Sequence, residues 1–156
     1  FTTSTIAWLF AYAGLLGAVV QGGLVGRLSK RFGEGRLIVA GTLLSFLALG
    51  FLPSASSLGP LLAILAVLAL GQGIAHPSLS ALTSKLVRPD EIGGVMGVYQ
   101  SISSLARIVG PFWAEVVYGK VGAAWPFRTG SIFMLLACAV AVVMLARLRR
   151  PEARTA

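Results

Sequence analysis

Five long apolar stretches, joined by short polar turns, make up most of this chain. They cover about residues 6–25, 37–52, 58–79, 95–118 and 129–148. An α-helix needs about 20 mostly apolar residues to cross a bilayer core of about 30 Å. Four stretches reach that length, and the Ser and Pro residues after the shorter second stretch suit the headgroup layer. The pattern predicts an all-α membrane protein with five transmembrane helices, followed by a tail at residues 149–156.

The composition supports a membrane protein. Hydrophobic residues form 56% of the chain and charged residues only 12%, whereas a soluble domain averages about 25% charged residues. A water-soluble fold is therefore not expected. No residues have the spacing of a metal site, a phosphate-binding loop or a nucleophile–base pair, so we expect neither an enzyme nor a cofactor.

Basic residues alternate between the turns. The first and third turns and the C-terminal end from Arg147 onward carry ten Lys and Arg residues together, whereas the second turn carries none and the fourth carries two, Lys120 and Arg128. Basic loops face the cytoplasm in most membrane proteins. The alternation predicts that Phe1 starts outside and that the C-terminus is cytoplasmic, in a protein of the cell membrane. The net charge of +8 is then an orientation signal, with contact to anionic lipids as a by-product and no role for nucleic acid.

The fourth apolar stretch carries two ionisable residues, Arg107 and Glu115. Charge at membrane depth is costly and normally faces a bundle interior or a watery cavity. At about 100° per residue, the polar residues of this stretch fall within roughly an 80° arc. We predict that this face lines a cavity or holds a structural ion pair, and its members are Gln100, Ser104, Arg107, Pro111, Glu115 and Tyr118.

The third stretch has a second polar face, formed by Gln72, His76 and Ser80 at four-residue spacing. His76 could relay protons or make an interhelical hydrogen bond, and the pattern favours the second role. Pro77, like Gly110 and Pro111 in the fourth stretch, predicts a helix kink.

Small residues recur every four positions in the first stretch, at Gly14, Ala18, Gly22 and Gly26. Such a stripe lets another helix approach closely, as static packing or as a gating contact. The lone Cys138 lies within an apolar stretch and is expected to be a packing residue.

The turn after the first stretch resembles the loop motif G-x-L-a-D-R-x-G of the major facilitator superfamily. Its residues are Gly26-Arg27-Leu28-Ser29-Lys30-Arg31-Phe32-Gly33, followed by Arg36. Lys30 stands at the Asp position, which is typical of the motif's second copy, between helices eight and nine.

The fourth stretch resembles the antiporter motif g-x8-G-x3-G-P-x2-G-G of the same superfamily. Gly97, Gly110 and Pro111 match its spacing, and other residues replace its remaining glycines, at Ala106, Ala114 and Glu115. Together with the segment from Gly73 to Pro77, this stretch resembles helices ten and eleven of the drug:proton antiporter branch, of the tetracycline-efflux type.

The resemblance implies that residues 1–156 are helices eight to twelve of a twelve-helix transporter, with the N-terminal half missing. It implies alternating-access transport of a small molecule, with proton-coupled efflux favoured. Uptake or facilitated diffusion of a sugar or metabolite is the alternative. The loop motif (Gly26, Lys30, Arg31, Gly33 and Arg36) would act as a cytoplasmic latch. The substrate cavity would include Gln72, His76, Gln100, Ser104, Arg107 and Glu115.

A rival hypothesis from another class is a membrane sensor or assembly protein that transports nothing. In that case the polar faces of the third and fourth stretches would only hold helices together. Partners expected under the transport hypothesis are a small-molecule substrate, protons, the lipid bilayer and the missing half of the transporter.

Overall fold

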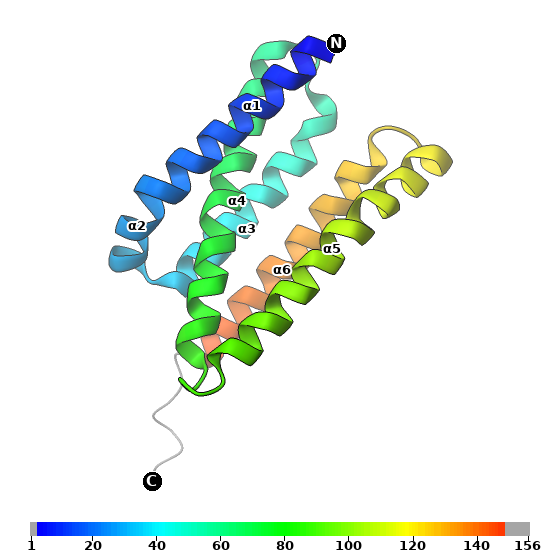
Figure 1. Ribbon diagram of the computed structural model, residues 1–156. Helices are drawn as coiled ribbons and strands as arrows, with labels where there is room; N and C mark the ends of the chain where they lie inside the picture. The colour runs from blue at the N-terminus through cyan, green and yellow to red at the C-terminus, as the bar shows by residue number, and fades with distance from the viewer. Residues whose placement is uncertain (1–2, 149–156) are drawn as a thin grey trace.

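A computed structural model describes residues 3–148, and the side chains of residues 7–148 (Figure 1). The first helical rod consists of α1 (Thr3–Val19), a π-helical segment η1 (Val20–Leu24) and α2 (Val25–Phe32). The tail beyond Leu148 and the start at Phe1 lie outside the described residues.

Four further helices follow the first rod, and no strand occurs within residues 3–148. They are α3 (Glu34–Phe51), prolonged by the 3₁₀ turn η2 (Leu52–Ser54), then α4 (Leu58–Leu86), α5 (Ile92–Val121) and α6 (Trp125–Leu148). Each predicted stretch lies inside one of these rods, so the all-α prediction is confirmed. The helices are joined by tight turns, two of which need a glycine with positive φ, Gly33 at 78° and Gly122 at 120°.

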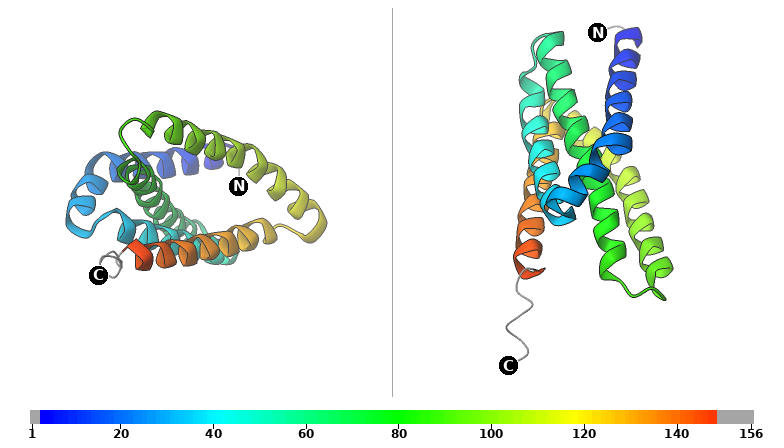
Figure 2. Two further views of the ribbon diagram at one scale, coloured as in Figure 1. Left: turned by 90° about the horizontal axis from the view of Figure 1, so that it is seen from below. Right: turned by 90° about the vertical axis from the view of Figure 1, so that its left-hand side faces the viewer.

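The helices run alternately up and down, and α3 lies at the centre of the packing. Its largest contacts are with α4 and α6, while α1 packs on α4. Helix α5 makes only small contacts with α6 and α4, and in Figures 1 and 2 the α5–α6 hairpin diverges from α1 at its far turn. The α2–α3 turn, the α4–α5 turn and the end of α6 lie at the same end of the molecule (Figure 1), which we call the basic end.

Four rods are long and apolar enough to cross a membrane, over Ala7–Phe32, Glu34–Ser54, Leu58–Leu86 and Trp125–Leu148. Helix α5 is also long, at 30 residues, but is not among them. The reason is the polar face of α5, which lowers the mean hydropathy of any segment of this helix that is long enough to span a membrane. The sequence predicted α5 as one of five apolar stretches, and the helix is confirmed, but its amphipathic character sets it apart from the four apolar spans.

A close backbone contact joins Gly41 of α3 to Gly71 of α4. A Cβ atom on Gly41 would lie 2.6 Å from the Gly71 carbonyl oxygen, and one on Gly71 would lie 2.7 Å from Ser45 Oγ. Ser45 Oγ in turn donates to the Gly41 carbonyl at 2.9 Å. Such backbone contact between helices is available only to glycine and is typical of membrane proteins.

Small polar side chains of α6 bind backbone carbonyls of α3. Ser131 Oγ donates to the Phe46 carbonyl at 3.0 Å, and Cys138 Sγ lies 3.8 Å from the Val39 carbonyl. Cys138 is buried, so its predicted packing role is confirmed.

The small-residue stripe of the first rod makes no comparable contact. A Cβ atom on Gly14, Gly22 or Gly26 would meet no described atom within 4 Å. The rod instead packs at Val20, whose Cγ1 lies 3.0 Å from the Cβ position of Gly73 in α4. The close approach expected at the stripe is thus not made by the described helices.

We predict that Gly41→Ala lowers the free energy of unfolding of the full-length protein by about 1–3 kcal/mol, as overpacking of a close contact does. The new methyl group would press on the Gly71 carbonyl and on Ala75, neither of which can rotate away. Thermal melting in mild detergent measures the effect. Gly59→Ala is the matched control, since its Cβ would meet nothing within 4 Å. Equal melting temperatures for both variants would contradict the close packing.

Candidate functional site

The polar faces of α4 and α5 lie open. All six predicted cavity residues, listed here, have exposed side chains: Gln72, His76, Gln100, Ser104, Arg107 and Glu115. The two faces meet where the His76 and Tyr99 rings make an edge contact, with centroids 6.1 Å apart and an interplanar angle of 66°. The structure therefore brings His76 of α4 next to α5.

No side chain of α5 is buried against the described part of the chain. Its other aromatic contact is an edge contact between Trp113 and Phe133 of α6, with centroids 6.5 Å apart. Neither of the ion pairs found among residues 7–148 involves Arg107 or Glu115. The two are about 12 Å apart along the axis, so they do not pair with each other.

The predicted kink residues lie within continuous helices. Helix α4 continues through Pro77 and α5 through Pro111. Gly110 has open space at its Cβ position. The kinks themselves stay a prediction.

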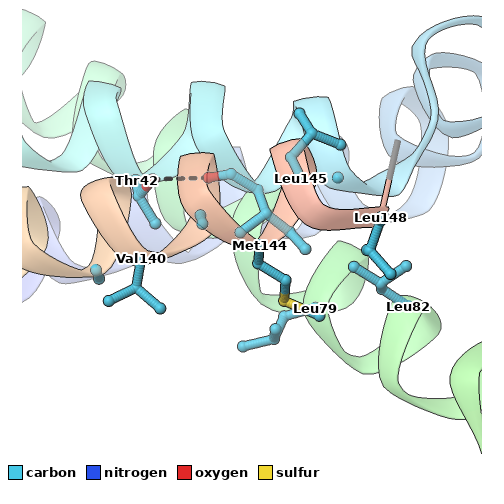
Figure 3. A pocket seen from close by; sticks show the side chains of 11 residues that line it. Thr42, Leu79, Leu82, Val140, Met144, Leu145 and Leu148 are labelled. Atoms are coloured by element: carbon cyan, nitrogen blue, oxygen red, sulfur yellow. Dashed lines mark hydrogen bonds between the residues drawn. The ribbon is translucent and has the colours of Figure 1, made fainter. Parts of the chain in front are cut away.

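A small apolar cavity opens between α3, α4 and α6 toward the basic end (Figure 3). Its volume is about 300 Å³. Thr42 supplies the hydroxyl group of its lining, and this hydroxyl already donates to the Ile38 carbonyl at 2.8 Å and to the Val39 carbonyl at 3.1 Å. The cavity therefore offers an apolar surface, and the proton of its Thr42 hydroxyl is already used in hydrogen bonds to the backbone. Sequence reasoning missed it, and its lining includes Ile38, Leu79, Leu82, Val140 and Met144.

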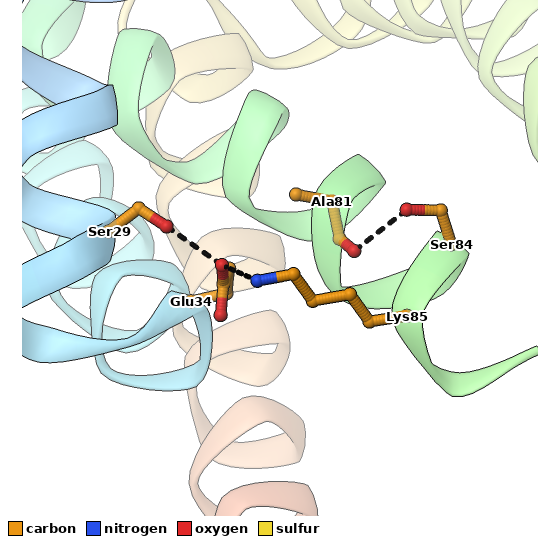
Figure 4. A network of polar contacts seen from close by, with 5 residues as sticks. All are labelled: Ser29, Glu34, Ala81, Ser84 and Lys85. Atoms are coloured by element: carbon orange, nitrogen blue, oxygen red, sulfur yellow. Dashed lines mark hydrogen bonds and ion pairs between the residues drawn. The ribbon is translucent and has the colours of Figure 1, made fainter.

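An ion pair ties three helices together at the basic end (Figure 4). Lys85 Nζ at the end of α4 donates to Glu34 Oε1 at the start of α3. Ser29 Oγ of α2 donates to the same oxygen at 2.7 Å. The Glu34 side chain is only 14% exposed, whereas that of Lys85 is 62% exposed.

The pairing of Glu34 with Lys85 was not predicted from the sequence. The signal was present, because α3 and α4 form an antiparallel hairpin. The first residue of α3 and the last turn of α4 must then lie at the same end, where opposite charges attract.

The loop-motif residues occupy two kinds of position. Gly33 is the turn itself, and its N–H donates to the Ser29 carbonyl at 3.0 Å. Gly26, Lys30, Arg31 and Arg36 are exposed. The motif thus places its glycine where the backbone requires one and leaves its cations free of the described core.

No group of three or more metal-ligating side chains occurs within the residues that the structure describes. The polar faces of α4 and α5 therefore present one cation, one carboxylate, one imidazole and several neutral hydrogen-bonding groups.

The amino-acid sequence is similar to those of several known proteins. The chain is 30% identical over 149 residues to the tetracycline resistance protein, class C, of Escherichia coli, which covers 96% of the chain and 36% of that protein. It is 30% identical over 142 residues to a multi-drug resistance efflux pump PmrA homolog of Lactococcus lactis, covering 86% of the chain and 35% of the relative. A mouse major facilitator superfamily domain-containing protein 10 is 32% identical, over 82% of the chain and 28% of the relative.

The chain thus spans about a third of the length of the relatives that it matches, 36% and 35% of the two bacterial proteins. The family model of the Major Facilitator Superfamily matches residues 1–156. The loop motif, the apolar helices and this match over the whole length agree, and the chain belongs to the Major Facilitator Superfamily of integral membrane transporters.

Proposed function

We propose that the chain is the C-terminal part, helices eight to twelve, of a transporter that exports a small organic molecule by alternating access. The observation that carries the proposal is the open polar face of α5. An amphipathic helix within an otherwise apolar bundle is stable in a membrane only where its polar side meets water, substrate or another polar helix. In secondary transporters such a surface faces the central cavity between two halves.

Arg107 is the group with the most to gain from that position. A guanidinium at membrane depth costs a few kcal/mol or more unless it is solvated or paired, and no described acid pairs with it. A cavity would supply water in the absence of substrate and an anionic or hydrogen-bond-accepting group in its presence. Gln100 and Ser104 lie on the same face and would add neutral hydrogen bonds.

The relatives support export of a drug-like substrate. Several are named tetracycline resistance proteins, and another is named a multi-drug resistance efflux pump homolog. We propose proton-coupled efflux across the cell membrane, with the polar faces of α4 and α5, which meet at His76 and Tyr99, along the transport path.

The basic end is proposed to face the cytoplasm, because seven described Lys and Arg residues lie there against two, Lys120 and Arg128, at the opposite end. The pair of Glu34 and Lys85 then forms the fixed part of the cytoplasmic latch. It holds α2, α3 and α4 as one unit when the two halves of the transporter rock.

Arg107→Gln in the full-length transporter is expected to lower the efflux rate about tenfold to a hundredfold, the loss that corresponds to one charge-assisted hydrogen bond. Efflux from energised membrane vesicles, corrected for the amount of protein in the membrane, measures it. Lys120→Gln on the same helix is the matched control and should transport normally, because Lys120 lies in the last turn of α5 at the opposite end. Normal efflux by Arg107→Gln would contradict the cavity role.

Single cysteines placed at Gln72, Ser104 and Arg107 should react with a water-soluble thiol reagent, and substrate should slow the reaction. The experiment uses the full-length protein with its other cysteines replaced. A cysteine at Ile74, which is buried in α4, is the control that should stay unreactive. Failure of all three exposed positions to react would favour the rival hypothesis of a membrane protein that transports nothing and whose polar faces only make contacts between helices.

Replacing Glu34 by Gln or Lys85 by Gln should each destabilise the full-length protein by about 1 kcal/mol or less, because one partner is largely solvent-exposed. The exchanged pair Glu34→Lys with Lys85→Glu should recover part of that loss. Thermal melting of the wild type, the two single variants and the charge-exchanged variant measures these effects. Asp90→Asn, which removes the pair of Arg88 and Asp90 in which both side chains are mostly exposed, is the control with no expected change. A charge-exchanged variant that melts below both single variants would contradict the pair.

A further inference from the structure

We propose that the outward face of α2 binds the headgroups of anionic phospholipids. This face consists of Arg27, Lys30 and Arg31 and is called here the basic face. The proposal rests on the embedding of the bundle in a membrane and is independent of whether the protein transports anything.

The basic face is set by helix geometry. Positions i, i+3 and i+4 lie within about 100° of one another on a helix, so the three cations project on one side. The opposite side of α2 packs inward, where Val25 is 9% exposed and joins the buried cluster with Leu37. In both the side view and the end view α2 lies at the edge of the bundle (Figures 1 and 2). The cations therefore face away from the described helices.

The three cations have no carboxylate partner among residues 7–148. The nearby acid, Glu34, is occupied by Lys85 and Ser29. The contact that the structure does show is the Arg31 guanidinium carbon 5.5 Å from the centroid of the Phe32 ring. Compensation of the helix dipole accounts for Lys30 and Arg31, which lie in the last turn. It does not account for Arg27, which lies a turn earlier.

The position of the basic face matches the level of the phosphates. It occupies the last turns of the rod over Ala7–Phe32, which is apolar enough to span a membrane. Just before it, Leu24 is 40% exposed, and the Cβ positions of Gly22, Gly23 and Gly26 meet no described atom within 4 Å. These exposed apolar and glycine residues, called here the strip, lie next to the three cations along the rod.

This sequence of surfaces fits a phospholipid better than an acidic protein segment. The strip accommodates an acyl chain, and the cations neutralise a phosphate and its anionic headgroup. Clusters of basic residues beside a transmembrane helix attract anionic lipids, at about fivefold in affinity for each Lys or Arg near the surface. An acidic peptide would use the charges and leave the strip empty.

The test uses the full-length protein reconstituted in bilayers of equimolar phosphatidylglycerol and phosphatidylcholine. Native mass spectrometry of the protein after release into mild detergent gives the ratio of bound phosphatidylglycerol to phosphatidylcholine. Each of Arg27→Gln, Lys30→Gln and Arg31→Gln should lower this ratio by up to about fivefold, and the triple variant should lower it most. High salt should lower it in the wild type as well.

Two control variants isolate the charge and its place. Lys120→Gln with Arg128→Gln removes two cations from the opposite end and should leave the ratio unchanged. Arg27→Lys with Arg31→Lys keeps the charge and should retain the preference for phosphatidylglycerol.

Three results would overturn the proposal. One is an unchanged ratio in all three single variants, which also decides the matter if the triple variant does not fold. Another is an equal fall in the ratio for the control at the opposite end. The third is an unchanged ratio together with a lower melting temperature in phosphatidylcholine alone, which would show that the basic face binds another part of the protein.

Discussion

The backbone contact between Gly41 and Gly71 is the constraint on which the rest of the packing depends. Lipid is as apolar as the side chains, so helices in a membrane gain little from burying hydrocarbon and associate through close van der Waals contact and hydrogen bonds. The two glycines bring α3 and α4 together at carbonyl distance. With α3 fixed in this way, α6 adds to its other side through Ser131 and Cys138, whose polar atoms reach α3 carbonyls.

Helix α5 follows a different rule. It has no backbone contact of this kind and no buried side chain in the described structure, and two edge contacts between rings connect it to its neighbours. Its polar residues are too numerous for a helix surrounded by lipid on all sides, and they lie on one face of the helix. The described bundle therefore contains a closely packed part, α3 with α4 and α6, and a helix, α5, whose polar face no described helix buries.

The apolar pattern was sufficient to predict the number and order of the helices and the end at which each turn lies, because both follow from one-dimensional periodicity. It did not reveal which residues touch. The stripe that begins at Gly14 looked like the contact, yet Gly41 and Gly71 make it. The pair of Glu34 and Lys85 and the cavity beside Thr42 escaped notice for the same reason. The rotation of each helix about its axis and the angle at which helices cross decide such contacts. Neither can be predicted from the composition or from the spacing of apolar residues.

Two separate electrostatic arrangements lie on opposite sides of α2. On the inner side, Ser29 and Lys85 both donate to Glu34, whose side chain is largely covered whereas that of Lys85 is mostly exposed. Arg27 and Arg31 lie on the outer side, where neither pairs with an acid among residues 7–148. If all the charges of the motif served one latch, the cations would lie nearest to the carboxylate that neutralises them. Instead a lysine from another helix takes that carboxylate, and the motif's own cations pair with no described acid.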